Sequence, residues 1–183
     1  ESIYVSKTER NISDLGLKSS AAKLLASGTV LLTKRAPVGE VAINAIPMAT
    51  NQGFLNFTCG SGLRPLYLAY WFRANKKYLN QVANGSTYRE LYKSDLSEFE
   101  IAVPSIEEQD AILSVIRSLQ FIAMLGLAIE QSAATADEMI HIQSQDRRLR
   151  RLCDAIVVQL LSGAIRSSDV RPARKRGRER HAV

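Results

Sequence analysis

A short turn between two β-rich segments carries the first residues with recognisable binding chemistry. Lys34 and Arg35 stand side by side in Lys34-Arg-Ala-Pro-Val-Gly39, where glycine and proline break the chain. A turn between two strands is the natural interpretation of this pattern, and two cations at the end of a rigid sheet suit contacts with phosphate oxygens. The alternative is a solvated loop without a ligand.

A second polar segment, Asn84-Gly-Ser-Thr-Tyr-Arg-Glu90, combines hydroxyls, an aromatic ring and a guanidinium on one loop. Side chains of these types contact phosphates and base edges. The candidate contacts here are Ser86, Thr87, Tyr88, Arg89 and Lys93. Alternatively, Ser86 or Thr87 caps the turn that follows. Asn51 and Gln52 also carry amides, but we favour a structural role for both.

The chain shows no recognisable catalytic motif. It lacks the Asn-Pro-Pro-Tyr and Asp-Pro-Pro-Tyr motifs of DNA amino-methyltransferases and a glycine-rich phosphate loop with lysine. Its histidines, His141 and His181, lie in different segments, and no metal site is predicted from them. Cys59 and Cys153 are also far apart, which suits buried thiols in a reducing compartment. We expect a protein that is not an enzyme on its own and carries no cofactor.

Charge is unevenly distributed along the chain, whose net charge is +6. Residues 1–104 contain 12 basic and 8 acidic residues, residues 105–163 contain 5 and 8, and residues 164–183 contain 7 and 2. The first segment favours a polyanionic partner, and the second does not. We expect the last to be a disordered basic tail that adds nonspecific phosphate affinity or is simply solvated. No run of about eighteen apolar residues predicts a membrane span.

The elements that position the polar residues are divided by a junction at residues 101–112, where a short apolar strand ends at a proline. Ser105 and Glu108 have the spacing of a capping box, which predicts the start of a helix. The helical pattern continues for roughly fifty residues. A continuous helix over residues 107–162 would span roughly 80 Å, and Gly163 would end it.

One apolar stripe follows this helix at heptad spacing. Past Ile140 its register shifts, which indicates a stutter or a break between two helical pieces. The preceding domain is too short to cover such a stripe, so we predict a partner helix from another chain or from a part of the protein outside this sequence. The residues expected at the helix interface are Ile112, Val115, Leu119, Ile122, Ile129, Ala133, Ala136, Ile140, Leu152 and Ile156.

The predicted fold is α+β. Residues 1–104 form a β-rich domain, residues 105–163 a long coiled-coil-forming α-helix for spacing and dimerisation, and residues 164–183 the tail. Strands are expected at 29–33, 40–43 and 51–57, and residues 99–103 are expected to return to the sheet.

Two helices are expected within the domain. A short one begins at Ser19 or Ser20 and ends at Leu25. A longer one begins near Pro65, where proline suits the first turn. Its aromatic stripe is interpreted as a core face rather than a base-stacking platform. The stripe consists of Tyr67, Tyr70, Trp71, Ala74 and Tyr78.

Together these segments resemble the specificity (S) subunit of type I restriction–modification enzymes. The resemblance covers nearly the whole chain except the basic tail, and it depends on the order and spacing of several motifs rather than on one. The motifs are Gly28-Thr-Val-Leu-Leu-Thr-Lys-Arg-Ala-Pro-Val-Gly39, Thr50-Asn-Gln52, Gly85-Ser-Thr87, Val103-Pro-Ser-Ile-Glu-Glu-Gln-Asp-Ala-Ile112 and Leu160-Leu-Ser-Gly-Ala-Ile-Arg166.

The resemblance implies a curved target-recognition domain that grips one half of a bipartite double-stranded DNA site. The helix that follows would pair antiparallel with a second such helix and dock methyltransferase (M) subunits. A restriction and motor (R) subunit would join the same cytoplasmic, prokaryotic complex. S-adenosylmethionine, Mg²⁺ and ATP would belong to those partner subunits.

The family pattern has two recognition domains and two such helices, whereas this chain has one helix and less than one full domain. The resemblance therefore implies the C-terminal part of an S subunit, with the domain's opening strands before Glu1, or a half-length S polypeptide that dimerises. One alternative is a truncated fragment that acts mainly as a coiled-coil interaction module. Another is the specificity part of a fused methyltransferase–nuclease. The DNA target is not predicted, because no residue code relates such loops to bases.

Overall fold

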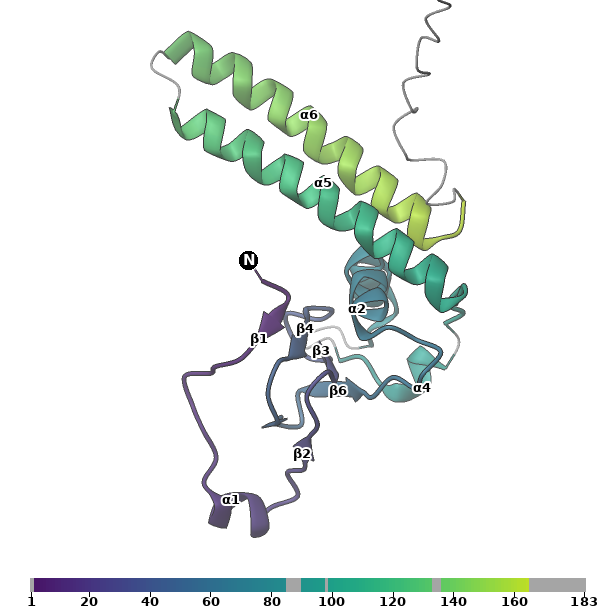
Figure 1. The fold of residues 1–183 in the computed structure, drawn as a ribbon. Coiled ribbons are helices and arrows are strands. Elements are labelled where there is room, and N and C mark those ends of the chain that lie inside the picture. The colour runs from purple at the N-terminus through teal and green to yellow at the C-terminus, as the bar shows by residue number, and fades with distance from the viewer. Residues whose placement is uncertain (1, 85–89, 98, 133–135, 165–183) are drawn as a thin grey trace, which may run out of the picture.

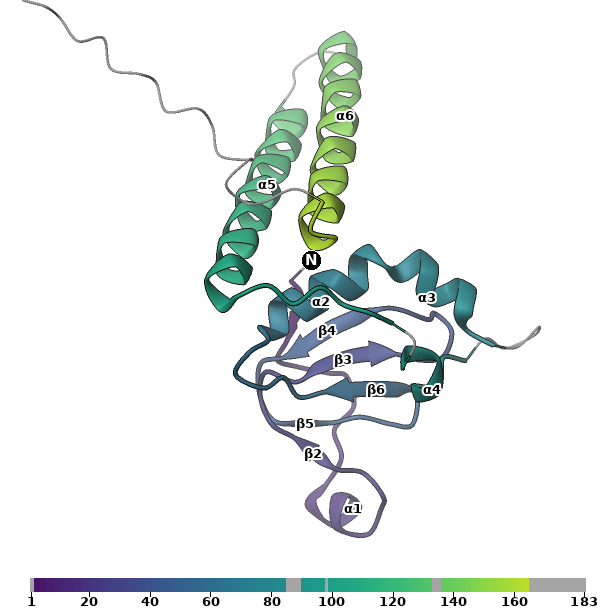
Figure 2. The same cartoon turned by 90° about the vertical axis from the view of Figure 1, so that its right-hand side faces the viewer.

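We describe the protein from a computed structural model, and the structure describes residues 2–84, 90–97, 99–132 and 136–164. A sheet, helices on one of its faces and a projecting pair of long helices are visible in Figures 1 and 2. The strands are β1 (Tyr4–Val5), β2 (Leu24–Leu25), β3 (Val30–Thr33), β4 (Val41–Asn44), β5 (Met48–Ala49) and β6 (Phe54–Phe57). The helices are α1 (Asp14–Lys18), α2 (Pro65–Ala74), α3 (Lys76–Val82), α4 (Lys93–Leu96), α5 (Ile106–Ser132) and α6 (Ala136–Leu161).

A four-stranded sheet in the order β1-β4-β3-β6 forms the centre of the N-terminal domain. β1 runs parallel to β4, and the other neighbouring strands are antiparallel. Val30, Leu32 and Ile43 are buried in the core with the side chains of α2, which lies across this face of the sheet (Figure 2). The predicted α+β class is confirmed, and β3, β4 and β6 confirm the three predicted strands of the sheet.

A smaller antiparallel sheet pairs β2 with β5, and α1 lies at the far end of the excursion between β1 and β2 (Figure 1). The hydroxyl of Ser13 caps α1 by accepting the Gly16 N–H at 3.1 Å. The helix expected between Ser19 and Leu25 is therefore wrong. The true N-cap lies earlier in the chain, and Leu25 belongs to a strand that pairs with Met48.

The aromatic residues of α2 form a core face, as their spacing predicts. Four of the five stripe residues are buried or half-buried: Tyr67, Tyr70, Trp71 and Ala74. Tyr78 differs, because the helix is interrupted at Asn75 and Tyr78 lies on α3 with 52% of its surface exposed. Its ring still packs against Phe99, with the ring centroids 4.9 Å apart.

The segment 99–103 does not join the sheet, so its prediction as a strand is wrong. It crosses α2 instead. The Phe99 ring meets the Trp71 ring edge-on at 5.9 Å, and the Tyr67 hydroxyl donates a hydrogen bond to the Ala102 carbonyl at 2.9 Å. These contacts hold the segment on the aromatic face of α2, where Phe99 and Ile101 are half-buried without strand pairing.

The C-terminal region is helical over the expected residues, but it forms two helices rather than one continuous helix. α5 and α6 lie side by side as an antiparallel pair in both views (Figures 1 and 2). Ser105 caps α5 as predicted, since its hydroxyl accepts the Glu108 N–H at 3.3 Å. Gly163 follows α6 with a φ of +74°, which also agrees with its predicted role.

The change of helix lies between Ser132 and Ala136, earlier than the register shift past Ile140 predicts. Folding back gives α5 a partner from its own chain, and Ile112, Val115 and Leu119 of its stripe are buried or half-buried without another molecule. The driving force is burial of apolar surface. Five residues from the two helices join the core of the N-terminal domain: Ile112, Leu113, Ile116, Leu160 and Leu161.

The predicted interface residues therefore have different environments. Ile112 is buried, Val115, Leu119 and Ile156 are half-buried, and Ile122 and Leu152 are exposed by 45% and 57%. Ala133 lies outside the described residues, as do the side chains of Ile129, Ala136 and Ile140. Ile122 and Leu152 are exposed because the antiparallel packing selects one side of each helix, and these two side chains lie off it.

Candidate nucleic-acid interface

Two of the predicted contact residues meet one carboxylate at the end of the central sheet. The Nζ of Lys34 lies 2.7 Å from Oε1 of Glu90, and the Nε of Arg35 lies 3.2 Å from the same oxygen. We call Lys34, Arg35 and Glu90 the sheet-end cluster. Because two cations share one anion, the cluster retains one net positive charge at the edge of the domain.

Backbone hydrogen bonds fix the position of this cluster. The Leu91 N–H donates to the Lys34 carbonyl at 2.8 Å, which joins the segment after Asn84 to the end of β3. Asn84 and Glu90 exchange two further hydrogen bonds, of 3.0 and 2.8 Å. The structure thus brings the two ends of the second predicted loop next to Lys34 and Arg35. Four predicted contacts of that loop lie outside the described residues: Ser86, Thr87, Tyr88 and Arg89.

Lys93, the last predicted contact, is exposed at the first residue of α4. Its neighbour Tyr92 extends the sheet-end cluster, since the Nζ of Lys34 lies 5.9 Å from the centre of the Tyr92 ring. The Tyr92 N–H donates to Oδ2 of Asp95 at 2.7 Å and holds this short helix in place. Lys93 therefore lies beside the cluster in the chain, but none of its described contacts joins it to Glu90.

Glu90 is ionised under ordinary conditions. A hydrogen bond from Lys34 lowers the pKa of its carboxyl group below the usual value; partial burial opposes this change, and Arg35 adds to the lowering. Protonation of Glu90 would remove the negative charge with which Lys34 and Arg35 both pair. Sequence reasoning missed Glu90, although its place at the end of the polar segment Asn84–Glu90 was a usable signal.

The turn that carries Lys34 and Arg35 is itself held firmly. The Gly39 N–H donates to the Thr33 carbonyl at 2.9 Å, and Gly39 adopts a φ of +86° that favours glycine. From the helical layer, Asn80 Nδ2 donates to the Val38 carbonyl at 2.8 Å, and Lys76 forms an ion pair with Glu40. The cations therefore project from a rigid support, as the sequence predicts for the end of a sheet.

A second polar cluster joins the N-terminal domain to the start of α5. Gln109 is fully buried, and its side-chain amide makes three hydrogen bonds of 2.8 to 2.9 Å to the backbone at Gly62, Arg64 and Pro104. Beside it, Arg64 donates twice to the carboxylate of Asp110, at 2.9 and 2.7 Å. We call Arg64, Gln109 and Asp110 the junction cluster.

The junction cluster is balanced in charge. Its bidentate hydrogen bond from Arg64 lowers the pKa of Asp110, while it raises that of Arg64 itself. Sequence reasoning found the helix start here but missed this cluster. The available signal was Gln109, a polar residue on the same helical side as buried Ile112, Leu113 and Ile116.

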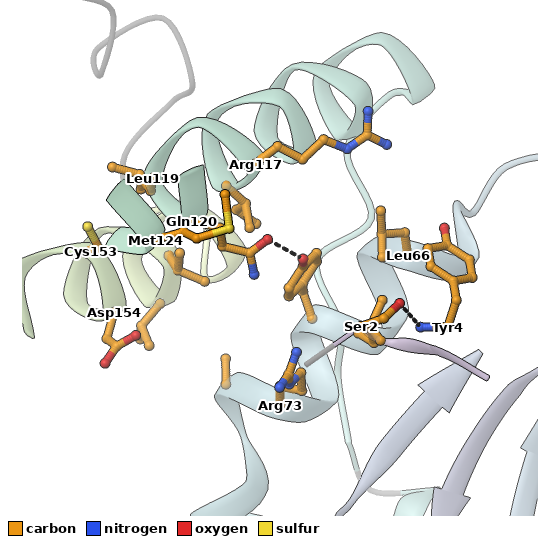
Figure 3. A pocket seen from close by; sticks show the side chains of 16 residues that line it. Ser2, Tyr4, Leu66, Arg73, Arg117, Leu119, Gln120, Met124, Cys153 and Asp154 are labelled. Atoms are coloured by element: carbon orange, nitrogen blue, oxygen red, sulfur yellow. Dashed lines mark hydrogen bonds between the residues drawn. The ribbon is translucent and has the colours of Figure 1, made fainter. Parts of the chain in front are cut away.

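A wide groove of about 1190 Å³ separates the helical pair from α2 and β1 (Figure 3). Arg73, Arg117 and Asp154 line it together with apolar side chains, and the Tyr70 hydroxyl donates across part of it to Gln120 Oε1 at 2.9 Å. Cys153 also lines the groove. Burial raises the pKa of the thiol of Cys59, the other cysteine. Within the described residues, no group of three or more His, Cys, Asp or Glu side chains is placed to hold a metal ion.

We compared the sequence with models of known protein families. Residues 2–124 match the type I restriction modification DNA specificity domain. The chain belongs to this family. The match includes the central sheet, α2, both polar clusters and most of α5.

Two curated relatives of the specificity domain come from Methanocaldococcus jannaschii. The type I restriction enzyme MjaIX specificity subunit is 44% identical over 118 residues, which are 63% of this chain and 27% of the relative. The putative MjaX specificity subunit is 22% identical over 146 residues, which are 79% of this chain and 30% of the relative. The chain thus spans less than a third of the length of either relative.

One solved structure with a TM-score above 0.5 shares the fold. A chain from a type I restriction–modification system, studied for its complex assembly and conformational transition, shares a TM-score of 0.51 at 22% identity, over 80% of this chain and 34% of that one. The HsdS subunit from Thermoanaerobacter tengcongensis gives 0.48 at 20% identity, over 80% and 33%. Among the described residues, no helix is long and apolar enough to cross a membrane.

Proposed function

We propose that this specificity domain recognises DNA sequence within a type I restriction–modification complex, reading one half of a bipartite site. The observation that supports it most is the sheet-end cluster. The cluster places Lys34 and Arg35 beside the ends of a polar loop, and one net positive charge remains after both pair with Glu90. The family to which the chain belongs is named for DNA specificity. Phosphate contacts of this kind set the register of a protein on DNA, and nearby polar side chains read the bases.

Each predicted residue has a role in this proposal. Lys34, Arg35 and Lys93 contact phosphates, and the polar side chains at 86–89 contact phosphates or base edges. The domain performs no chemistry itself. Methyltransferase and restriction–motor subunits supply catalysis, with S-adenosylmethionine, Mg²⁺ and ATP bound to them. A second recognition domain, from the same subunit or from a second copy, reads the other half-site.

The proposal is tested by measuring DNA binding of the full chain over a range of salt concentrations. A randomised duplex pool selected for binding should become enriched in one sequence pattern. Replacing Lys34 and Arg35 together by glutamine should reduce affinity and flatten the plot of log affinity against log salt by up to about 0.9 per lost phosphate contact. Lys77→Glu, which lowers the net charge by the same two units at an exposed position of α3, serves as the matched control.

Two outcomes would count against this function. One is a selection without any sequence preference. The other is a double variant that binds DNA with the same affinity and salt dependence as Lys77→Glu.

A second function, association through the helical pair, is supported by exposed apolar side chains on α5. Phe121 and Leu125 are four residues apart, lie on the same side of the helix and are exposed by 56% and 46%; Met124 beside them is exposed by 58%. Replacing Phe121 and Leu125 by glutamate should lower the sedimentation coefficient if copies associate there. Deleting residues 105–163 is a poorer test, because it also removes core residues such as Ile112 and Leu160.

A further inference from the structure

We infer that Glu90 is a positioning residue that orients Lys34 and Arg35 and limits how strongly they bind DNA of any sequence. This inference rests on the proposed function, since it concerns how the domain controls its own phosphate contacts. It assigns a specificity-determining role to an acidic residue in a region that otherwise attracts DNA through positive charge.

The first support is the geometry of the ion pairs. Lys34 and Arg35 both approach Oε1 of Glu90, at 2.7 and 3.2 Å. The side chains of Lys34 and Glu90 are each only 20% exposed, whereas that of Arg35 is 50% exposed. The lysine is therefore held closely, and the arginine remains more open to a ligand on the outer side of the cluster.

The second support is the backbone around Glu90. Two hydrogen bonds to Asn84 and the adjacent bond from Leu91 to Lys34 hold residue 90 directly beside the β3–β4 turn. Arg35 and Glu90 also form an isolated antiparallel bridge. The carboxylate is thus carried by a fixed part of the fold, and its position relative to the cations is set before DNA arrives.

The physical consequence concerns the free energy of phosphate binding. A cation that already pairs with a carboxylate must give up or share that pairing when it meets a phosphate, so its net gain is smaller. An unpaired lysine or arginine on a flexible side chain adapts to phosphates on any duplex. Glu90 therefore reduces binding that does not depend on sequence, and it keeps the two cations in one orientation at the end of the central sheet.

The test compares Glu90→Gln with wild type on a duplex of arbitrary sequence. The amide keeps the size of the side chain but removes its charge. We expect the slope of log affinity against log salt to steepen by up to about 0.9, and affinity at low salt to rise up to about tenfold, which corresponds to one additional phosphate contact. Glu100→Gln makes the same change in net charge at an exposed site outside the cluster and is the matched control.

Two further variants separate positioning from a purely structural role. Glu90→Asp keeps the negative charge and should restore a salt slope close to that of wild type. Combining Glu90→Gln with Lys34→Gln and Arg35→Gln should abolish the increase in salt slope and affinity, because the side chains at 34 and 35 are then uncharged. If Glu90 has only a structural role, Glu90→Gln should lower the melting temperature without steepening the plot of log affinity against log salt. A slope no steeper than that of wild type overturns the inference.

The outcomes also distinguish this inference from the proposed function. If wild type fails to bind duplex DNA at low salt, the proposed function fails and the inference fails with it. If wild type binds with a clear salt dependence, but Glu90→Gln binds no more tightly than Glu100→Gln, the role of Glu90 alone is refuted.

Discussion

The sheet-end cluster and the junction cluster contain similar kinds of side chains but have different roles. In the junction cluster one arginine faces one aspartate in a bidentate pair, and the adjacent Gln109 is fully buried with three hydrogen bonds. In the sheet-end cluster two cations share a single carboxylate oxygen, and one of them is half exposed. One cluster is complete within the chain; the other keeps a surplus charge.

This difference separates a contact that builds the fold from one that is ready for a ligand. In the junction cluster, buried Gln109 stabilises one arrangement of its elements, because its amide would lose three hydrogen bonds in any other arrangement; the Arg64–Asp110 pair beside it is about half exposed. An unbalanced cluster at the surface leaves part of its electrostatic attraction available to an anion. The contrast can be tested through stability, acid sensitivity and a weak ring contact.

The largest expected effect is on Gln109. Gln109→Leu should lower the free energy of unfolding by about 2–4 kcal/mol, because it removes a fully buried amide and leaves three partly buried backbone groups without their hydrogen-bond partner. Urea unfolding followed by circular dichroism measures this change. Gln81→Leu, at an exposed position of α3, should change stability by less than about 0.5 kcal/mol. Equal effects of the two variants would show that the junction cluster does not support the fold.

A smaller effect is expected from Asp110 and should depend on pH. Its pKa is lower in the folded protein than in the unfolded chain, so its stabilising contribution is present above about pH 4 and is lost as pH falls through the folded-state value. Asp110→Asn should therefore be less stable than wild type at neutral pH, and the two should converge in acid. Thermal melts from pH 7 to pH 2.5 measure this.

Arg64→Gln provides the companion measurement, since it removes the other half of the pair. It should reproduce the convergence in acid. A constant difference between Asp110→Asn and wild type at every pH would contradict the assigned ion pair.

The smallest effect is expected at Tyr92. Tyr92→Leu removes the ring near Lys34 and should cost no more than about 1 kcal/mol, the usual range for such a contact at a partly exposed site. In a Lys34→Met background the same substitution should have almost no effect. A double-mutant cycle on unfolding free energies measures the coupling, and full additivity would show that the cation and the ring do not interact.

The central part of the fold follows from local sequence patterns. The apolar, β-rich runs of β3 and β4 and the turn between them predict the sheet, because such residues favour strands and the turn carries glycine and proline. Lys34 and Arg35 were found at the end of this sheet for the same reason. Ser105 and Gly163 marked the outer limits of the helical region because caps depend on single residues.

The parts that sequence did not predict depend on contacts between distant residues. The heptad pattern of α5 and α6 is compatible with a partner from any chain, so it does not reveal that α6 folds back on α5. Phe99 looked like a strand residue, yet the aromatic surface of α2 determines its position. Glu90 and Gln109 were missed because their partners lie far away in the chain, at Lys34 and at Gly62.

The junction cluster also determines how precisely the helical pair is oriented relative to the N-terminal domain. α5 contains 27 residues, and at 1.5 Å per residue its far end lies about 40 Å from its first residue. A change of about 10° in the angle of its first turn would displace that end by about 7 Å, roughly two base-pair steps of a DNA duplex. A few hydrogen bonds at the base of the helix thus determine angular precision over a distance far larger than their own length.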